Sequence, residues 1–152
     1  MKKSLLSALA ILLFGSLAMA QSSKQVNWNA SAKKTGDKTY EVILTANIGA
    51  GFHLYSQNVG GDGPIATSFA FTKSPLYILS GKTAEQGKLI TVMEKAWGHN
   101  VNYYEGTVSF VQVVKTKTNA KTAIKVSADF MVCNDHECLP PSTVELNVPV
   151  GQ

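Results

Sequence analysis

Alternation of apolar and polar residues dominates this sequence and predicts β-strands almost throughout. Two segments near the C-terminus show it best: every second residue of 124–132 is apolar, and 143–150 repeats the pattern. Successive side chains of a strand point to opposite faces of a sheet, so a period of two predicts strands with one buried face. Pro149 has no amide hydrogen for a sheet ladder, so the last strand should end there or form an edge.

The segments 39–47 and 107–114 alternate in the same way. Both faces of 107–114 are largely apolar, which predicts a central strand. Weaker candidates complete the set: 26–32, 51–56, 67–72, 77–79 and 89–93. Turn-forming residues separate them, and no stretch of about eleven residues keeps a helical period. Seven to nine short strands at this spacing predict an all-β fold, an antiparallel β-sandwich.

The first 20 residues follow a different pattern, that of a cleaved signal peptide. Lys2 and Lys3 precede an apolar run over 5–14, and Ala18-Met19-Ala20 resembles a small-residue cleavage site. No later stretch approaches the ~18 apolar residues of a membrane span. We therefore expect an exported, periplasmic chain of one domain, residues 21–152, with no membrane insertion after cleavage.

Charge narrows the possible partners. The formal net charge of +4 falls to +2 once Lys2 and Lys3 are set aside, and the chain contains no Arg. Recognition of bases and phosphates relies on Arg and on basic stripes interleaved with aromatic residues. A nucleic-acid partner is therefore not expected.

Both cysteines lie in one segment, Cys133-Asn134-Asp135-His136-Glu137-Cys138, between the two best-patterned strands. If those strands are neighbours, the segment closes one end of the sandwich, and four intervening residues allow a disulfide. Export is compatible with an oxidised pair. Three interpretations stay open on the residues alone: a structural staple, a redox-active pair and a metal site.

Each interpretation has its own physical test. A staple would contribute little, because a ring of six residues stabilises the fold by only about 2 kcal/mol. A zinc or copper site would draw on Cys133, Asp135, His136, Cys138, His53 and His99, but such sites usually take ligand pairs from two segments. A redox pair depends on its thiolate population, which acidic neighbours disfavour and a protonated His136 favours. We expect such a pair to be inert alone and activated on docking.

The segment Phe130-Met131-Val132-Cys133-Asn134-Asp135-His136-Glu137-Cys138-Leu139-Pro140-Pro141 resembles the active-site segment of a known family. That family is the N-terminal periplasmic domain of the thiol:disulfide interchange protein DsbD, in its Bacteroidetes-type versions. Two supporting segments, 62–69 and 101–110, extend the resemblance over nearly the whole mature chain.

The resemblance implies an immunoglobulin-like β-sandwich with a redox-active disulfide and no cofactor. The family accepts electrons from a thioredoxin-like domain or membrane electron carrier and passes them to oxidised periplasmic proteins, including in cytochrome c biogenesis. By this likeness Cys138 is the interacting cysteine and Cys133 the resolving one, in a component of a protein-disulfide reductase. The rival hypotheses are an immunoglobulin-like interaction domain with an inert disulfide, and a periplasmic metal chaperone.

The family also shields its disulfide with a cap loop, which matches residues 94–99 here. The resemblance makes Trp97 the shield, with Glu94 and His136 as modulating residues. Without the resemblance, Trp97 suits the core equally well, and Glu94 is a solvated charge at a strand end. His53 and His99 are then loop residues without a role. Ala96 stands where the family has an aromatic residue, and the spacing between the cysteines is slightly short. Without a membrane or thioredoxin domain, the electron donor should be a separate protein.

Overall fold

The computed structural model describes residues 22–151, so the predicted signal peptide lies outside the described residues. Within this range the chain forms one short helix and eleven strands. They are α1 (Ser22–Gln25), β1 (Val26–Gly36), β2 (Thr39–Ile48), β3 (His53–Tyr55), β4 (Ser68–Phe71), β5 (Tyr77–Gln86), β6 (Ile90–Glu94), β7 (His99–Tyr104), β8 (Thr107–Thr116), β9 (Thr122–Phe130), β10 (Val132–Cys133) and β11 (Ser142–Val150). The predicted all-β class is confirmed. No helix in 22–151 is both long and apolar enough to cross a membrane.

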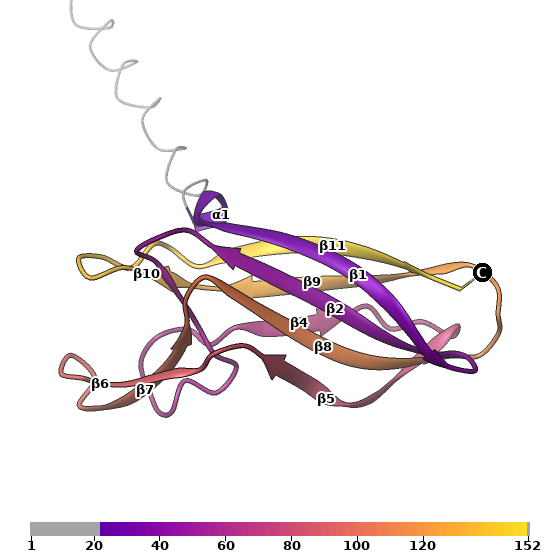
Figure 1. Cartoon of the computed structure of the whole chain (residues 1–152), viewed down its shortest axis with the longest axis horizontal. Coiled ribbons are helices and arrows are strands. Elements are labelled where there is room, and N and C mark those ends of the chain that lie inside the picture. The colour runs from indigo at the N-terminus through magenta and orange to yellow at the C-terminus, as the bar shows by residue number, and fades with distance from the viewer. Residues whose placement is uncertain (1–21, 152) are drawn as a thin grey trace, which may run out of the picture.

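The strands form three antiparallel sheets, with the orders β1-β2-β8-β5, β11-β9-β4 and β10-β3-β7-β6. The first two extend along the length of the molecule, and the third lies at the end opposite the C-terminus (Figure 1). β8 is central in its sheet, as the apolar character of both faces predicts. β11 is an edge strand, which explains how it accommodates Pro149.

The alternation in the sequence becomes the core of the sandwich. In β2, Tyr40, Val42, Leu44 and Ala46 are all at most 5 % exposed. Trp28 of β1 joins two sheets, because its ring lies 5.9 Å from Phe110 of β8, 5.5 Å from Phe130 of β9 and 6.0 Å from Phe69 of β4. Such contacts bury large apolar areas, so this core stabilises the domain without a disulfide spanning the two sheets.

The predicted strand over 124–132 is wrong in one respect, because it divides at Met131. β9 stays beside β11, whereas β10 pairs with β3, with Val132 opposite Leu54 and Cys133 opposite His53. Both partners in the first pair are completely buried. The break therefore moves the cysteine from the long sheet to the small one.

Two other predictions also need correction. His53 and His99 lie in strands β3 and β7, not in loops. No strand range was predicted for β7, although Tyr103 and Tyr104 suit strand positions, because its apolar residues are too few to show a period of two. β7 nevertheless joins β3 to β6, so it forms the middle of the sheet that holds the cysteine.

The sheet β10-β3-β7-β6 has two faces with different surroundings. Val132, Leu54 and Tyr104 lie in the main core, on one face. On the other face, Cys133 lies in a second cluster with Tyr55, Val59, Val101 and Met131. Alternation along β10 thus places the cysteine on the opposite face from its neighbour Val132.

Candidate redox site

Cys133 and Cys138 face each other across a tight hairpin that leads from β10 toward β11. Their sulfurs are bonded at 1.97 Å, and their Cα atoms are 4.0 Å apart. Two backbone hydrogen bonds of 2.9 Å flank the pair: Asn134 N–H to the Glu137 carbonyl, and Leu139 N–H to the Val132 carbonyl. The cysteines are thus a non-hydrogen-bonded pair, the kind in which opposite Cα atoms come closest.

The side chain of Asn134 holds the turn of this hairpin. Its Oδ1 accepts hydrogen bonds from the backbone amides of His136 and Glu137, each at 2.8 Å. Asn favours such turns because its amide oxygen can bond to backbone groups two or three residues further along. These bonds do not involve sulfur, so the hairpin has its own means of keeping the cysteines together when the bridge opens.

The two cysteines differ sharply in exposure. Cys133 is 2 % exposed, whereas Cys138 lies on the surface. Thiol–disulfide exchange requires a thiolate to reach the sulfur that it attacks, while the other sulfur departs. An incoming thiolate can therefore reach Cys138 and expel Cys133. The roles that the family resemblance implies for the two residues stay predictions.

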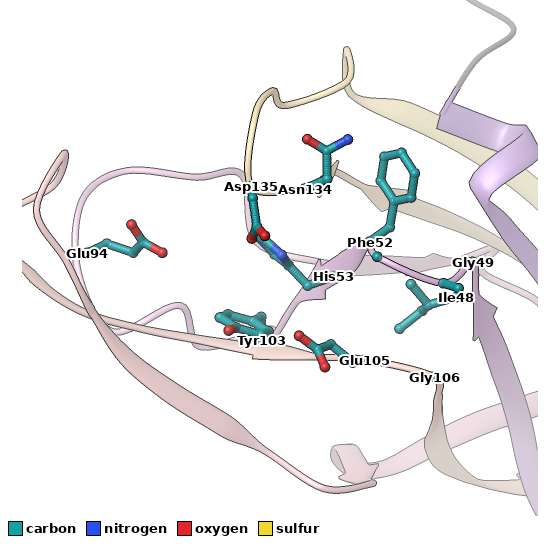
Figure 2. Close-up of a pocket in the computed structure, with 12 residues that line it drawn as sticks. Ile48, Gly49, Phe52, His53, Glu94, Tyr103, Glu105, Gly106, Asn134 and Asp135 are labelled. Carbon is teal, nitrogen blue, oxygen red and sulfur yellow. The ribbon is translucent and has the colours of Figure 1, made fainter.

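A polar cleft of about 680 Å³ opens beside the hairpin. Three carboxylates line it, those of Glu94, Glu105 and Asp135, together with His53 and Tyr103. Figure 2 shows the imidazole of His53 between Asp135 of the hairpin and Tyr103 of β7. The cleft thus gives solvent access to a surface that combines negative charge with one imidazole.

The imidazole of His53 is held by aromatic residues. Its ring is tilted by 31° over Tyr103, with a centroid separation of 4.3 Å. Its Nε2 lies 3.2 Å from the hydroxyl of Tyr55. Since Tyr55 and Tyr103 are directly opposite each other on β3 and β7, the sheet itself fixes the ring.

Burial controls the protonation of these three side chains. It lowers the pKa of His53 below 6.5, although the negative charges of Glu105, Glu94 and Asp135 oppose the shift. Burial, helped by Glu94 and Tyr103, raises the pKa of Tyr55 to about 12. The pKa of Tyr103 is raised chiefly for the same reason. At neutral pH both tyrosines keep their protons and His53 is mainly neutral.

The residues predicted as modulators occupy different places. Glu94 ends β6 and lines the cleft, whereas His136 is exposed at the tip of the hairpin. Trp97 is 46 % exposed, so the core position considered for it is wrong. Its ring lies against Gly63, where an added Cβ would come within 2.8 Å of the ring. The shielding role of Trp97 stays a prediction.

The metal interpretation has little support from the arrangement of its ligands. Both sulfurs are committed to the bridge, and His99 bonds elsewhere, through Nε2 to the Asp62 carbonyl at 2.6 Å. Among residues 22–151, no three His, Cys, Asp or Glu side chains are arranged to hold a metal ion.

Sequence reasoning placed His53 near the cysteines only as a possible metal ligand, and it missed Tyr55, Tyr103 and Glu105 as residues of this site. The alternation of 51–56 could have placed His53 and Tyr55 on one face. It could not have shown that β10 pairs with β3, because the one irregularity in the pattern of 124–132, an apolar Met131 at a polar position, does not identify a partner strand.

The chain combines an immunoglobulin-like β-sandwich with a hairpin disulfide in which one cysteine is buried and the other is exposed. These features are typical of thiol–disulfide exchange domains. The chain belongs to the family described as thiol:disulfide interchange protein DsbD, N-terminal, whose model matches residues 20–149. This family acts through a cysteine disulfide and needs no cofactor. No curated protein matches the chain by sequence.

Among the solved structures that share the fold are two N-terminal domains. The N-terminal domain of DsbD from Neisseria meningitidis, in its reduced form, has 12 % identity and a TM-score of 0.53, covering 86 % of this chain and 89 % of that one. The N-terminal periplasmic domain of ScsB from Proteus mirabilis has 15 % identity and a TM-score of 0.52. That match covers 82 % of this chain and 44 % of the ScsB chain.

Proposed function

We propose that this protein is exported, loses residues 1–20, and works in the periplasm as a thiol–disulfide exchange module. It relays electrons from a thioredoxin-like domain or membrane electron carrier to oxidised client proteins through Cys133 and Cys138. The observation that carries the proposal is the unequal exposure of the two cysteines, 2 % for Cys133 against a surface position for Cys138.

The first half-reaction loads the domain with electrons. A thiolate of the reduced partner attacks Sγ of Cys138, the bond to Cys133 breaks, and Cys133 leaves as a thiolate that takes up a proton. The partner's second thiolate then attacks the partner's sulfur in the mixed disulfide and releases Cys138. The partner ends as a disulfide, and the domain has gained two electrons and two protons.

The second half-reaction passes the electrons on. The Cys138 thiolate attacks a client disulfide and releases one client thiol. Cys133 loses its proton and attacks Sγ of Cys138, which releases the second client thiol and restores the bridge. Because the Asn134 turn holds the hairpin, Cys133 stays beside the mixed disulfide. Glu94 modulates charge at the cleft, and residues 94–99 with Trp97 act as the cap.

The main alternative is an interaction domain whose disulfide is inert. A ring this small contributes only about 2 kcal/mol, and the aromatic core already joins the long sheets. A purely structural role also gives no reason for exposing one cysteine of the pair. The exchange function is therefore the better supported of the two.

A trapping experiment tests the proposal. In Cys133→Ser, Cys138 keeps its thiol but mixed disulfides cannot be resolved, so thioredoxin-like proteins of a periplasmic extract should accumulate on it. The matched variant Cys138→Ser, which leaves only the buried thiol, should trap far less. Absence of trapping by Cys133→Ser, together with a bridge potential well below ~−300 mV, would establish the inert disulfide instead.

A further inference from the structure

His53 is the residue directly opposite Cys133 in the pairing of β3 with β10. Side chains directly opposite in an antiparallel pair share a face of the sheet, with Cβ atoms roughly 5 Å apart. The next pair in the register, Leu54 and Val132, faces the main core. The sheet therefore places an ionisable side chain, that of His53, directly opposite the buried cysteine.

Cys133 has a chemical need for such a neighbour. When the bridge opens, this sulfur departs as a thiolate at a position that is only 2 % exposed. Burial makes a thiolate costly, and the negative charges in the cleft disfavour it further. A sulfur whose thiol has a high pKa is also a slow leaving group, unless a proton reaches it as it departs.

We propose that His53 is the proton-exchange partner of the Cys133 sulfur. The proposal rests on the exchange function above and names a residue that serves it. As the Cys133–Cys138 bond breaks, a proton enters from solvent through the cleft, binds the imidazole and passes to the Cys133 thiolate. When Cys133 later attacks the mixed disulfide, the neutral imidazole takes the proton back and returns it to solvent.

The surroundings of the imidazole suit this task. The Tyr55 hydroxyl, 3.2 Å from Nε2, keeps its own proton and can donate it in a hydrogen bond to that nitrogen. The Tyr55 oxygen can equally accept a hydrogen bond from Nε2–H, and in that tautomer Nδ1 is the nitrogen that accepts and releases the exchangeable proton. Stacking on Tyr103 at 4.3 Å keeps the ring in place while its charge changes.

The charged groups around His53 come from each neighbouring element. They are Glu94 at the end of β6, Glu105 after β7 and Asp135 in the cysteine hairpin, and the titratable Tyr55 and Tyr103 complete the set. The three carboxylates stabilise the imidazolium formed in transit, while burial keeps the resting ring neutral. The ring can therefore take up a proton in transit and release it again.

The test uses a single-thiol form of the full mature chain, Cys138→Ser, in which Cys133 can be titrated by the ¹³Cβ chemical shift. Adding His53→Gln or His53→Phe should reduce the thiolate fraction of Cys133 at pH 7 by about tenfold, which is a rise of one pKa unit. The parent should titrate in two coupled steps, and both double variants in one. The two replacements separate the possible roles, because Phe keeps the stacking and Gln keeps hydrogen bonding.

Unchanged titration of Cys133 in both double variants would overturn the proposal. A titration curve of Cys133 in the His53→Phe double variant that matches the parent would also overturn it, because ring packing and not proton exchange would then set the titration. A second measurement avoids mutation: the pKa of His53 should differ between the disulfide and dithiol forms of the natural chain, with His99 as the internal reference. An identical pKa in both forms would also overturn it. Neither measurement uses a partner protein. The trapping experiment can therefore fail while proton coupling between His53 and Cys133 is found, and trapping can succeed while that coupling is absent.

Discussion

The two faces of the small sheet β10-β3-β7-β6 are made from neighbouring residues of the same strands, yet they differ in what surrounds them. Leu54, Val132 and Tyr104 face the main core and are at most 3 % exposed. His53 and Tyr103, on the opposite face, are half-buried around a cleft and lie next to a cysteine. One face thus packs wholly against the main core, whereas the other combines a small buried cluster around Cys133 with a solvated cleft.

This division explains how a domain can contain an accessible disulfide without depending on it. The core face anchors β3, β7 and β10, so the cleft face can carry ionisable groups at modest cost to the fold. Two of the following experiments compare a variant on one face with a variant on the other, and two change the cleft face alone.

The largest effect is expected on the core face. Leu54 is completely buried, so Leu54→Ala should lower the free energy of unfolding by about 3 kcal/mol through lost apolar contact and a cavity. Urea unfolding of the oxidised protein measures it. The adjacent His53→Ala, on the cleft face, should cost less than half as much. Equal losses from the two variants would show that the faces do not differ in this way.

Reduction of the bridge should have a smaller effect. Opening the six-residue ring removes about 2 kcal/mol, and the aromatic core should keep the domain folded. Urea unfolding with and without a reductant gives the difference, and Cys133→Ser with Cys138→Ser reproduces the reduced state without one. Unfolding of the domain on reduction alone would mean that the disulfide is a structural staple after all.

Removing a single hydroxyl group from the core face should lower the free energy of unfolding by less than reduction of the bridge does. Tyr104 donates a hydrogen bond of 2.6 Å to Glu85, which also accepts from Ser56 and the amide of Gln57. Tyr104→Phe should cost about 1.5 kcal/mol, the scale of a hydrogen bond to a charged group. Tyr103→Phe, on the cleft face, should change the unfolding free energy by less than ~0.5 kcal/mol. A reversed order would contradict the assignment of the faces.

The smallest effect concerns pH and the exposed end of the cleft face. His99 places Nδ1 2.8 Å from the Asn100 carbonyl and Nε2 2.6 Å from the Asp62 carbonyl, and only the imidazolium can donate to both. The hydrogen bond to the Asn100 carbonyl, and after it the one to the Asp62 carbonyl, raises the pKa of His99 above 6.5. The stabilisation is therefore complete below the unfolded value of 6.5 and is lost as pH rises through the raised folded value.

Amide exchange in residues 60–63 measures this contact. Protection relative to His99→Gln at the same pH should be greatest in mild acid and should vanish at alkaline pH. A ratio that does not change with pH would show that the ring does not titrate in this contact.

Much of the fold could be predicted, because the long strands carry their own signal. The alternation in 39–47 became the buried row of β2, and the doubly apolar 107–114 became the central β8. The weak strand 51–56 and the unpredicted β7 are short and partly polar, so their positions depend on pairing with distant segments rather than on local pattern.

The site shows the same limit. The cysteine pair and its loop are visible in the sequence, since spacing alone brings Cys133 and Cys138 together. The cleft is not, because His53 and Glu105 are about 80 and 30 residues away from Cys133 and meet it only through β10, β3 and β7. The exposure of each sulfur depends on the same pairing.

The most direct test of the central idea is to find which sulfur an attacking thiol binds. A thioredoxin with its second active-site cysteine changed to Ser would be mixed with the oxidised domain, and peptide mapping by mass spectrometry would locate the mixed disulfide. The unequal exposure of the two cysteines predicts that essentially all of it is on Cys138. A mixed disulfide mainly on Cys133, or divided equally between the two, would contradict it.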